Sequence, residues 1–545
     1  MKTLLLPKRF VCFLRWVLSI ALPLLIICQV CRASESLAVE VNAGSEILIG
    51  EYTDQITAVA AFKGIPYAAP PVEERRWKAP EQHKPRAGKQ LATRFADACF
   101  QDNYNTQWYQ RVGAAFGVSP EVFTDPSFSE DCLYLNIWTP SLSKGKKLPV
   151  MVWIHGGSNK AGWSYEQNYI GTKLAQQGQV IVVSIAYRLG VFGFFSHPEL
   201  IQNNAPANFG LLDQIEALKW INKNVEQFGG DSSNITLFGE SAGAANIGNL
   251  ILSPLADGLF QRAISQSGGF QLWNNVELKN QQTFGHDLAN SLNITDRSLS
   301  TLKKESATVL FNKAKQDFPE YYYGASVDGH VLPDTALNLL FNRKLQIDLL
   351  IGNNQDEWLM YLDNSPEKLA KMIKSYPKEI QNVLKERAQQ EQSIARGHDQ
   401  ASTLIDMVCP GYAYAQQIVK SDNRAYIYRF KRVRTGKGGE QLQAYHGAEI
   451  PYVFDSHDDW LTTDKEDKAL TTAMVRYWTN FAKNGDPNDP KSTDLPNWPQ
   501  FDEKDPKVLA LSAHISVIAA PDFSNCRKIF PVLQQNSKKR IIEEN

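Results

Sequence analysis

The sequence predicts an α/β fold with a large, mostly parallel central sheet flanked by helices. Apolar runs of strand-forming residues, separated by turn signals, recur at residues 133–138, 150–154, 180–185 and 235–238. Continuous apolar runs of this length are typical of strands covered on both faces, as in a parallel sheet. Residues 211–228 lie between the last two runs and carry apolar side chains at helical spacing, which predicts a crossover helix. Strand, helix and strand in this order form the repeating unit of an α/β sheet.

The first 33 residues have the composition of a removable signal peptide. Basic residues between Lys2 and Arg15 precede an apolar run at residues 16–30, and Ala33 ends a small-residue cleavage site. The apolar run is short for a bilayer span, which needs about 20 residues, and Pro23 interrupts it. We therefore expect a secreted or periplasmic protein without stable membrane association after cleavage. A retained N-terminal membrane anchor is the alternative.

Residues 34–545 are expected to form one domain with loop and helical excursions. Neither an internal repeat nor a low-complexity linker divides them, and residues 39–61 alternate as strands do. Helical stretches are expected at residues 365–402, with a break at Pro377, and at residues 474–481.

The composition limits the classes of function. The chain has 545 residues, 43% of them hydrophobic, and a formal net charge of −1. It is long enough to bury a large core, and its balanced charge argues against a nucleic-acid surface, which requires a basic excess. The HExxH, Walker A and EF-hand patterns do not occur, so no metal and no organic cofactor are expected.

One serine stands in the pattern of a catalytic nucleophile. In FGESAGA (238–244), Ser241 lies between Gly239 and Gly243, after a predicted strand and before an alanine-rich helix. A G-x-S-x-G sequence in this setting forms a sharp elbow that exposes the serine hydroxyl. Glycines flank the serine because side chains there would collide with neighbouring backbone. An ordinary glycine-rich turn is the alternative, and a true nucleophile also needs a base, an acid and oxyanion donors.

A glycine pair after the strand at 150–154 predicts the oxyanion donors. The sequence continues as HGGS from His155 to Ser158. An upstream HGG segment and the amide after the serine form the oxyanion hole of esterases. The backbone amides of Gly157, Ser158 and Ala242 are therefore the candidate donors. A plain glycine turn at the end of a strand is the alternative.

The candidate base is a histidine downstream of the serine. His446 lies in AYHGAEIP, after a polar, glycine-rich stretch whose loop can carry it over the sheet edge. His398 and His457 stand among charged residues, which favours solvated surface positions. Position alone favours His446 but does not exclude the other histidines after Ser241. These are His286, His330, His398, His457 and His514.

The candidate acid follows a short apolar strand at residues 348–352. Asp356 and Glu357 both stand in the loop after this strand, where either can supply a carboxylate. The spacing does not separate them, and a solvated pair of charges is the alternative.

Four cysteines remain beyond the signal segment: Cys99, Cys132, Cys409 and Cys526. An even number is compatible with two disulfides in an oxidising compartment. Four cysteines allow three pairings, and the spacing does not choose among them.

Taken together, these motifs resemble the type-B carboxylesterases, the α/β-hydrolase branch that includes cholinesterases and bile-salt lipases. The resemblance extends from about residue 55 to residue 500 in family order, and the combination of EDCLYLN with GESAG is highly specific. It implies an α/β-hydrolase fold with excursions over the active site. The segments that carry it are AFKGIPYAAPPV (61–72), EDCLYLNIWTP (130–140), VMVWIHGG (150–157), AYRLGVFGF (186–194), NFGLLDQIEALKWI (208–221), FGGDSSNITLFGESAG (228–243), HGAEIPYVF (446–454) and WTNFAKNGDPN (478–488).

The resemblance assigns the roles that spacing left open. It implies Ser241 as nucleophile, Glu357 as acid and His446 as base, with the oxyanion amides on the three residues already named. Glu240, inside the elbow, corresponds to a carboxylate that tunes the site in the family. Ser267 resembles a second buried serine near the triad.

The resemblance also implies structural pairs. The disulfide pairings would be Cys99–Cys132 and Cys409–Cys526. Salt bridges would join Arg76 to Glu130 and Arg188 to Asp213, without a catalytic role. These assignments rest on the family pattern.

The sequence departs from the family pattern at two points. The usual third glycine of the oxyanion loop is Ser158, whose amide can still donate although its side chain can narrow the hole. Cholinesterases carry a choline-binding tryptophan about ten residues before the EDC cysteine. The corresponding position, near Val122, has no tryptophan, so choline esters are not favoured.

These observations predict a serine hydrolase that cleaves small-molecule carboxylic esters through an acyl-enzyme intermediate. A lipase or an amide or carbamate hydrolase on the same triad is the near alternative. A non-catalytic binding ectodomain on this fold is the alternative from another class, although such relatives typically lack the serine or the histidine.

Overall fold

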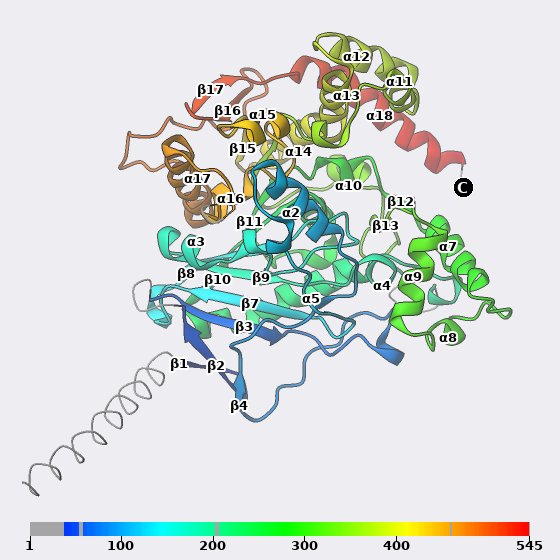
Figure 1. Cartoon of the computed structure of the whole chain (residues 1–545), viewed down its shortest axis with the longest axis vertical. Coiled ribbons are helices and arrows are strands. Elements are labelled where there is room, and N and C mark those ends of the chain that lie inside the picture. The colour runs from blue at the N-terminus through cyan, green and yellow to red at the C-terminus, as the bar shows by residue number, and fades with distance from the viewer. Residues whose placement is uncertain (1–37, 54–57, 202–205, 458–459, 544–545) are drawn as a thin grey trace, which may run out of the picture.

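A computed structural model of the chain describes residues 38–53, 58–201, 206–457 and 460–543, with side chains to residue 535. These residues form one large sheet, whose strands lie in the order β1-β2-β3-β7-β9-β8-β10-β11-β14-β15-β16-β17, with β4 beside β2 (Figure 1). The sheet extends from β1 at the bottom of Figure 1 to β17 near the top. The expected signal peptide at residues 1–33, and the alternative anchor, lie outside the described residues.

The strands are short to medium in length, and two small strand pairs stand apart from the main sheet. The main sheet contains β1 (Ala38–Ala43), β2 (Glu46–Tyr52), β3 (Ala60–Pro66), β4 (Gly88–Leu91), β7 (Tyr134–Thr139), β8 (Leu148–Ile154), β9 (Ile181–Ile185), β10 (Gly230–Glu240), β11 (Arg262–Gln266), β14 (Asp348–Asn354), β15 (Ala425–Phe430), β16 (Lys507–Leu511) and β17 (Ser516–Ala519). The small pairs are β5 (Ala98–Cys99) with β6 (Phe128–Ser129), and β12 (Val276–Glu277) with β13 (Ser326–Val327).

The expected parallel core is confirmed from β9 through β8, β10, β11, β14 and β15 to β16. The prediction for the run at 133–138 is wrong in direction, because β7 pairs antiparallel with both β3 and β9. Its residues after Tyr134 are nevertheless buried. Burial on both faces, and not strand direction, therefore gave this run its continuous apolar character.

The helices connect these strands and cover the sheet. They are α2 (Tyr104–Ala115), α3 (Thr172–Gly178), α4 (Gly190–Gly193), α5 (Phe209–Asn224), α6 (Ala242–Leu252), α7 (Leu278–Ser291), α8 (Leu299–Leu302), α9 (Ala307–Asp317), α10 (Ala336–Asn342), α11 (Pro366–Lys374), α12 (Lys378–Gln389), α13 (Ile394–Thr403), α14 (Cys409–Lys420), α15 (Lys437–Leu442), α16 (Ile450–Phe454), α17 (Lys465–Asn484) and α18 (Phe523–Glu543). A π-helical turn, Leu404–Val408, joins α13 to α14.

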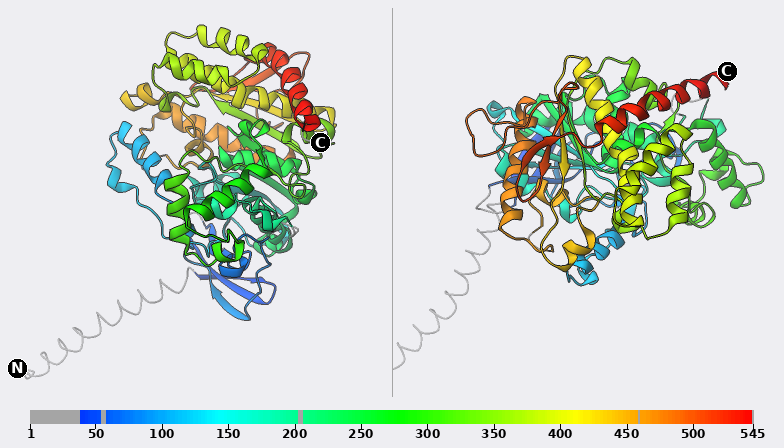
Figure 2. Two further views of the ribbon diagram at one scale, coloured as in Figure 1. Left: turned by 90° about the vertical axis from the view of Figure 1, so that its right-hand side faces the viewer. Right: turned by 90° about the horizontal axis from the view of Figure 1, so that it is seen from above.

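The predicted helices are present. The crossover expected at 211–228 is α5, followed by a 3-10 turn, and the stretch at 365–402 forms α11, α12 and α13, with Pro377 at the N-cap of α12. Helix α17 begins in a capping box between Asp464 and Asp467 and ends at Gly485, which has a positive φ of 70°. These caps satisfy some of the terminal backbone groups of the helix. Helices α12 and α18 pack together (Figures 1 and 2).

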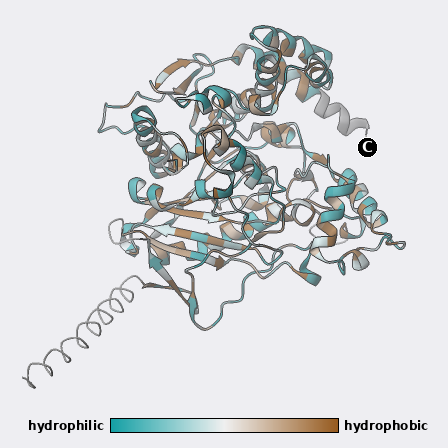
Figure 3. Ribbon diagram, viewed as in Figure 1, coloured by the Kyte–Doolittle hydropathy of each residue, from teal (hydrophilic) through white to brown (hydrophobic). Residues whose placement is uncertain are grey.

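The core lies on both faces of the central strands. Every residue of β9 is buried, and β8 is buried except for Pro149. Figure 3 shows apolar residues along the strands and polar residues over much of the outer helices α9 and α17. This arrangement removes apolar surface from water and fixes the sheet as a rigid platform.

Two disulfides join the expected pairs, Cys99 to Cys132 and Cys409 to Cys526. The second links the start of α14 to α18. Structural disulfides are typical of proteins that fold outside the cytoplasm. Among the described residues, none of the helices combines the length and the apolar character needed to cross a bilayer.

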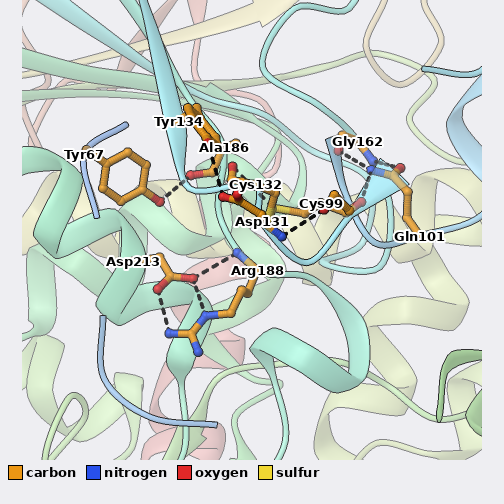
Figure 4. The surroundings of a disulfide bond; sticks show 11 residues. Tyr67, Cys99, Gln101, Asp131, Cys132, Tyr134, Gly162, Ala186, Arg188 and Asp213 are labelled. Atoms are coloured by element: carbon orange, nitrogen blue, oxygen red, sulfur yellow. Dashed lines mark hydrogen bonds and ion pairs between the residues drawn. A yellow bond between two sulfur atoms is a disulfide. The ribbon is translucent and has the colours of Figure 1, made fainter. Parts of the chain in front are cut away.

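Both expected salt bridges are also present. Arg76 and Glu130 approach to 2.6 Å, and Arg188 and Asp213 to 2.7 Å. The second pair is almost completely buried, and Asp213 also accepts a hydrogen bond from the backbone N–H of Arg188 (Figure 4). It ties the segment after β9 to helix α5.

We predict that Arg188→Met destabilises the protein by about 3–5 kcal/mol, because it leaves the buried carboxylate of Asp213 without a partner. Thermal unfolding checks this prediction. The double variant R188M/D213L should unfold closer to the wild-type temperature than R188M, since it removes both charges. A double variant less stable than R188M would contradict the argument.

Candidate functional site

Ser241 occupies a strained turn between β10 and α6. Its φ of 54° and ψ of −126° lie outside the regions that non-glycine residues favour. Its backbone N–H donates to the carbonyl of Gln266 at 2.9 Å, and its carbonyl accepts from Ala245 at 2.8 Å. The predicted elbow is thus formed at the carboxyl edge of the parallel sheet, where α/β folds place their ligands.

The glycines of the elbow pack directly against the end of β8. A Cβ on Gly239 would lie 2.5 Å from the carbonyl oxygen of Ile154, and one on Gly243 would lie 2.0 Å from the same oxygen. A Cβ on Gly156 would lie 3.1 Å from Cβ of Ser241. The backbone of the elbow can therefore approach β8 this closely only without side chains at these positions.

The candidate oxyanion loop leaves β8 beside the elbow. Gly157 has a φ of 104° and Ser158 a φ of 58°. Within the described part of the chain, the amides of Gly157 and Ser158 donate to no protein acceptor. Ala242 is the first residue of α6, where an N–H has no partner inside its own helix. All three residues line one cavity.

The loop is supported from the side of the Cys99–Cys132 disulfide. The side-chain amide of Gln101 donates to the carbonyl of Gly162 at 2.7 Å and accepts from its N–H at 2.7 Å (Figure 4). A Cβ on Gly162 would lie 2.4 Å from the carbonyl oxygen of Gly156. The loop that contains the disulfide therefore packs closely against the candidate oxyanion loop.

Glu357 contacts His446 directly. Its Oε2 lies 2.6 Å from Nδ1 of the imidazole. Its Oε1 accepts from the hydroxyl of Ser267 and from the N–H of Asn354, each at 2.6 Å. Glu357 is completely buried and His446 is 8% exposed. Three donors therefore surround the carboxylate and fix its orientation toward the imidazole.

Asp356, the other candidate acid, points elsewhere. Its Oδ1 forms an ion pair with Arg396 at 2.9 Å, and its Oδ2 accepts from the N–H of Ala444 at 3.2 Å. Asp356 is buried, so the alternative of a solvated pair of charges is wrong for both residues. Its role is to anchor the loop that carries His446.

Glu240 lies on the other side of the imidazole. Its Oε1 is 3.2 Å from Nε2 of His446. Burial alone would lower the pKa of His446, but Glu240 and Glu357 favour the imidazolium and raise that pKa above its usual range. Burial raises the pKa of Glu240, and His446 opposes this shift.

Ser241 and His446 line the same cavity, and no hydrogen bond joins them among the described residues. Catalytic hydrogen bonds often form only in the substrate complex.

The surface positions expected for His398 and His457 are wrong. His398 is 8% exposed, and His457 is completely buried, with hydrogen bonds to Thr463 and Thr471 at 2.8 Å. Asp399, a charged neighbour of His398 in the sequence, is itself completely buried. Neither histidine lines the cavity with Ser241.

The cavity has a volume of about 550 Å³. Much of its wall is aromatic, contributed by segments far apart in the sequence, and no local sequence signal brings them together. Val122, where the sequence lacks the choline-binding tryptophan, does not line it. The aromatic wall consists of Tyr104, Trp108, Tyr109, Tyr169, Phe270, Tyr322, Trp358 and Tyr361.

Glu166 is a buried acid in the wall that the sequence did not reveal. Its carboxylate accepts from Asn105 at 3.0 Å, from the N–H of Trp163 at 3.0 Å and from the hydroxyl of Tyr109 at 2.8 Å. Burial raises the pKa of Glu166 to about 7. Through these three hydrogen bonds, Glu166 holds helix α2 against the segment that follows the candidate oxyanion loop.

Among the described residues, no group of three or more His, Cys, Asp or Glu side chains is arranged to hold a metal ion.

Known proteins are similar to this chain in sequence and architecture. The model of a family described as "Carboxylesterase family" matches residues 36–527. The chain is 32% identical to para-nitrobenzyl esterase of Bacillus subtilis (strain 168), over 87% of this chain and 95% of that protein. It is 33% identical to carboxylesterase 4A of Bos taurus, over 91% and 96%. A solved carboxylesterase of Geobacillus stearothermophilus superposes with a TM-score of 0.76 at 32% identity, over 91% and 100%.

We predict that Gly243→Ala lowers the rate of hydrolysis of an activated ester about 100-fold or more, because the new Cβ displaces Ser241 from β8. Gly411→Ala is the matched control: its Cβ would meet only Ile351, at 3.9 Å. Steady-state rates and thermal unfolding of both variants check the prediction. Equal activity of the two variants would contradict it.

Proposed function

The chain belongs to the carboxylesterase family of ester hydrolases and has the α/β-hydrolase fold, and from this premise we propose that Ser241, Glu357 and His446 act as its catalytic triad. The supporting observation is the 2.6 Å contact between Glu357 and His446 in the wall of the cavity that contains Ser241. We propose further that residues 34–545 form one catalytic domain, secreted or periplasmic after removal of the signal peptide and without stable membrane association.

The first half of the reaction forms an acyl-enzyme. His446 accepts the proton of Ser241 through Nε2 while Oγ attacks the ester carbonyl, and the imidazolium then protonates the departing alcohol. Glu357 holds the imidazole in the tautomer that carries a proton on Nδ1 and stabilises the imidazolium. Ser267 and Asn354 support this role, since both donate to the same carboxylate.

The tetrahedral oxyanion binds to the amides of Gly157, Ser158 and Ala242. These N–H groups are fixed by the strained loop and by the start of α6, so little reorganisation is needed when charge develops. A serine in place of the usual third glycine at position 158 is compatible with this role, because the backbone amide of Ser158 is the proposed donor and the residue is exposed. Losing one such donor costs about 3 kcal/mol in enzymes where it has been measured.

The second half repeats the cycle with water. His446 removes a proton from water as the water oxygen attacks the acyl carbonyl, and the imidazolium then returns a proton to Oγ of Ser241 as the acyl C–O bond breaks and the carboxylic acid leaves. The 550 Å³ cavity and its aromatic wall favour small to medium apolar esters. Activity on p-nitrophenyl esters of rising chain length would separate an esterase from a lipase, and matched amides would test the hydrolase alternative.

Covalent labelling tests the serine itself. We expect the folded protein to take one organophosphonate adduct on Ser241, and Ser241→Ala to take none. If the folded wild-type protein took no adduct while a known esterase did, the result would favour the alternative of a non-catalytic binding ectodomain.

We predict that Glu357→Gln lowers kcat about 10⁴-fold, because the imidazole loses the carboxylate that orients it and stabilises its charge. Asp356→Asn is the matched control at the neighbouring acid, which contacts Arg396 and not His446, and it should retain at least a tenth of wild-type activity. Steady-state kinetics of the two variants check this. Loss of similar size in both would contradict the assignment of Glu357.

We predict that Glu240→Gln shifts the acid limb of kcat/KM to lower pH. The reaction needs neutral His446, and Glu240 raises the pKa of that imidazole; removing the charge therefore lowers the pKa and leaves more base at a given pH. Rate profiles from about pH 5 to pH 10 check the direction. A limb that stays in place or moves to higher pH would refute the role given to Glu240.

A further inference from the structure

The residue after the proposed triad acid lies against the face of the proposed base. Trp358 and His446 have ring centroids 5.3 Å apart, and their planes differ by 21°. The backbone N–H of Trp358 donates to Asp399 on α13 at 2.7 Å. One turn of the chain therefore brings a carboxylate to the edge of the imidazole and an indole to its face.

We propose that Trp358 is a positioning residue that holds the imidazole plane of His446 and stabilises its imidazolium during ester hydrolysis. This inference rests on the proposed function. Among the described residues, the polar contacts of the ring lie at its edges, with Glu357 at Nδ1 and Glu240 at Nε2. Two edge contacts fix the ring atoms that they touch but leave the ring free to tilt about the line between them. Contact with the indole face restrains that tilt.

The stacked indole of Trp358 stabilises the transition state more than the ground state. His446 is neutral before attack and positively charged while it holds the serine proton. An aromatic face within about 6 Å of a cation attracts it, more so where water is excluded. The neutral imidazole gains only the weaker attraction of two offset rings. Such an interaction raises kcat because it strengthens as the charge develops.

Three carboxylates favour the imidazolium form of His446, and they account for only part of its environment. They are Glu240 from the end of β10, Glu357 from the loop after β14 and Glu449 from the segment before α16. Trp358 contributes from the remaining face without adding a charge. Removing the indole should therefore lower the pKa of His446, as removing Glu240 should, but without changing the net charge of the site.

The site offers matched variants. The buried Nε1 of Trp358 has no hydrogen-bond partner among the described residues, so Trp358→Phe keeps an aromatic face without losing a hydrogen bond. Trp358→Met fills space without a π face. Trp108→Met is the control, because Trp108 lines the same cavity and packs on Tyr109 and Tyr445 instead of His446.

The experiment compares pH profiles of kcat and kcat/KM for a p-nitrophenyl ester in the full-length wild-type protein and the three variants, with thermal unfolding to establish folding. We expect W358M to lower kcat about 3- to 30-fold and to move the acid limb about 0.5–1 pH unit lower. W358F should recover most of both effects. W108M should change KM and leave the acid limb in place.

The proposal is overturned if W358M behaves like W108M, or if W358F loses as much kcat as W358M. If W358M does not fold, W358L replaces it under the same criteria. Failure of this inference is distinguishable from failure of the proposed function, because the latter would appear as an inactive wild-type protein or as an active S241A variant.

Discussion

The site depends on the close backbone approach between the serine elbow and the end of β8. Gly239 and Gly243 lie so near the carbonyl of Ile154 that neither position has room for a Cβ. This approach places Ser241, the proposed nucleophile, beside the loop that starts at His155. Because β8 and β10 are parallel neighbours, their carboxyl ends meet at one edge. A single backbone packing contact therefore brings the proposed nucleophile and the proposed oxyanion donors together.

The proposed acid and the proposed base reach this edge by longer routes, and a hydrogen-bond network holds them there. Glu357 is fixed by Ser267 and Asn354, and Asp356 anchors the loop of His446 through the N–H of Ala444. The carboxylates around the imidazole are buried, which is costly unless each has donors or a partner charge. Those donors keep the imidazole within a cavity of aromatic walls. Electrostatic preorganisation of this kind is the main means by which enzymes stabilise developing charge.

Much of the fold could be predicted because the strands near the centre are buried on both faces. Continuous apolar runs marked β8, β9 and β10, and helical periodicity marked α5. The direction of β7 could not be predicted, since burial leaves the same pattern in parallel and antiparallel strands. The exposure of His398 and His457 was also mispredicted, because charged neighbours in sequence say little about where one imidazole points.

The sequence by itself determined the elbow, the candidate oxyanion loop and the family resemblance, because each is carried by local residue patterns, and at the elbow backbone sterics demand glycine. Glycines at 239 and 243 are required wherever the chain turns so tightly. Residue spacing left Asp356 and Glu357 open and the family resemblance pointed to Glu357; the tertiary structure shows that Glu357 is the one that faces His446. Only the tertiary structure decided that Glu240 and Trp358 enclose the same imidazole and which aromatic side chains form the cavity wall. These relations join segments that are distant along the chain, and long-range packing leaves no trace in local residue order.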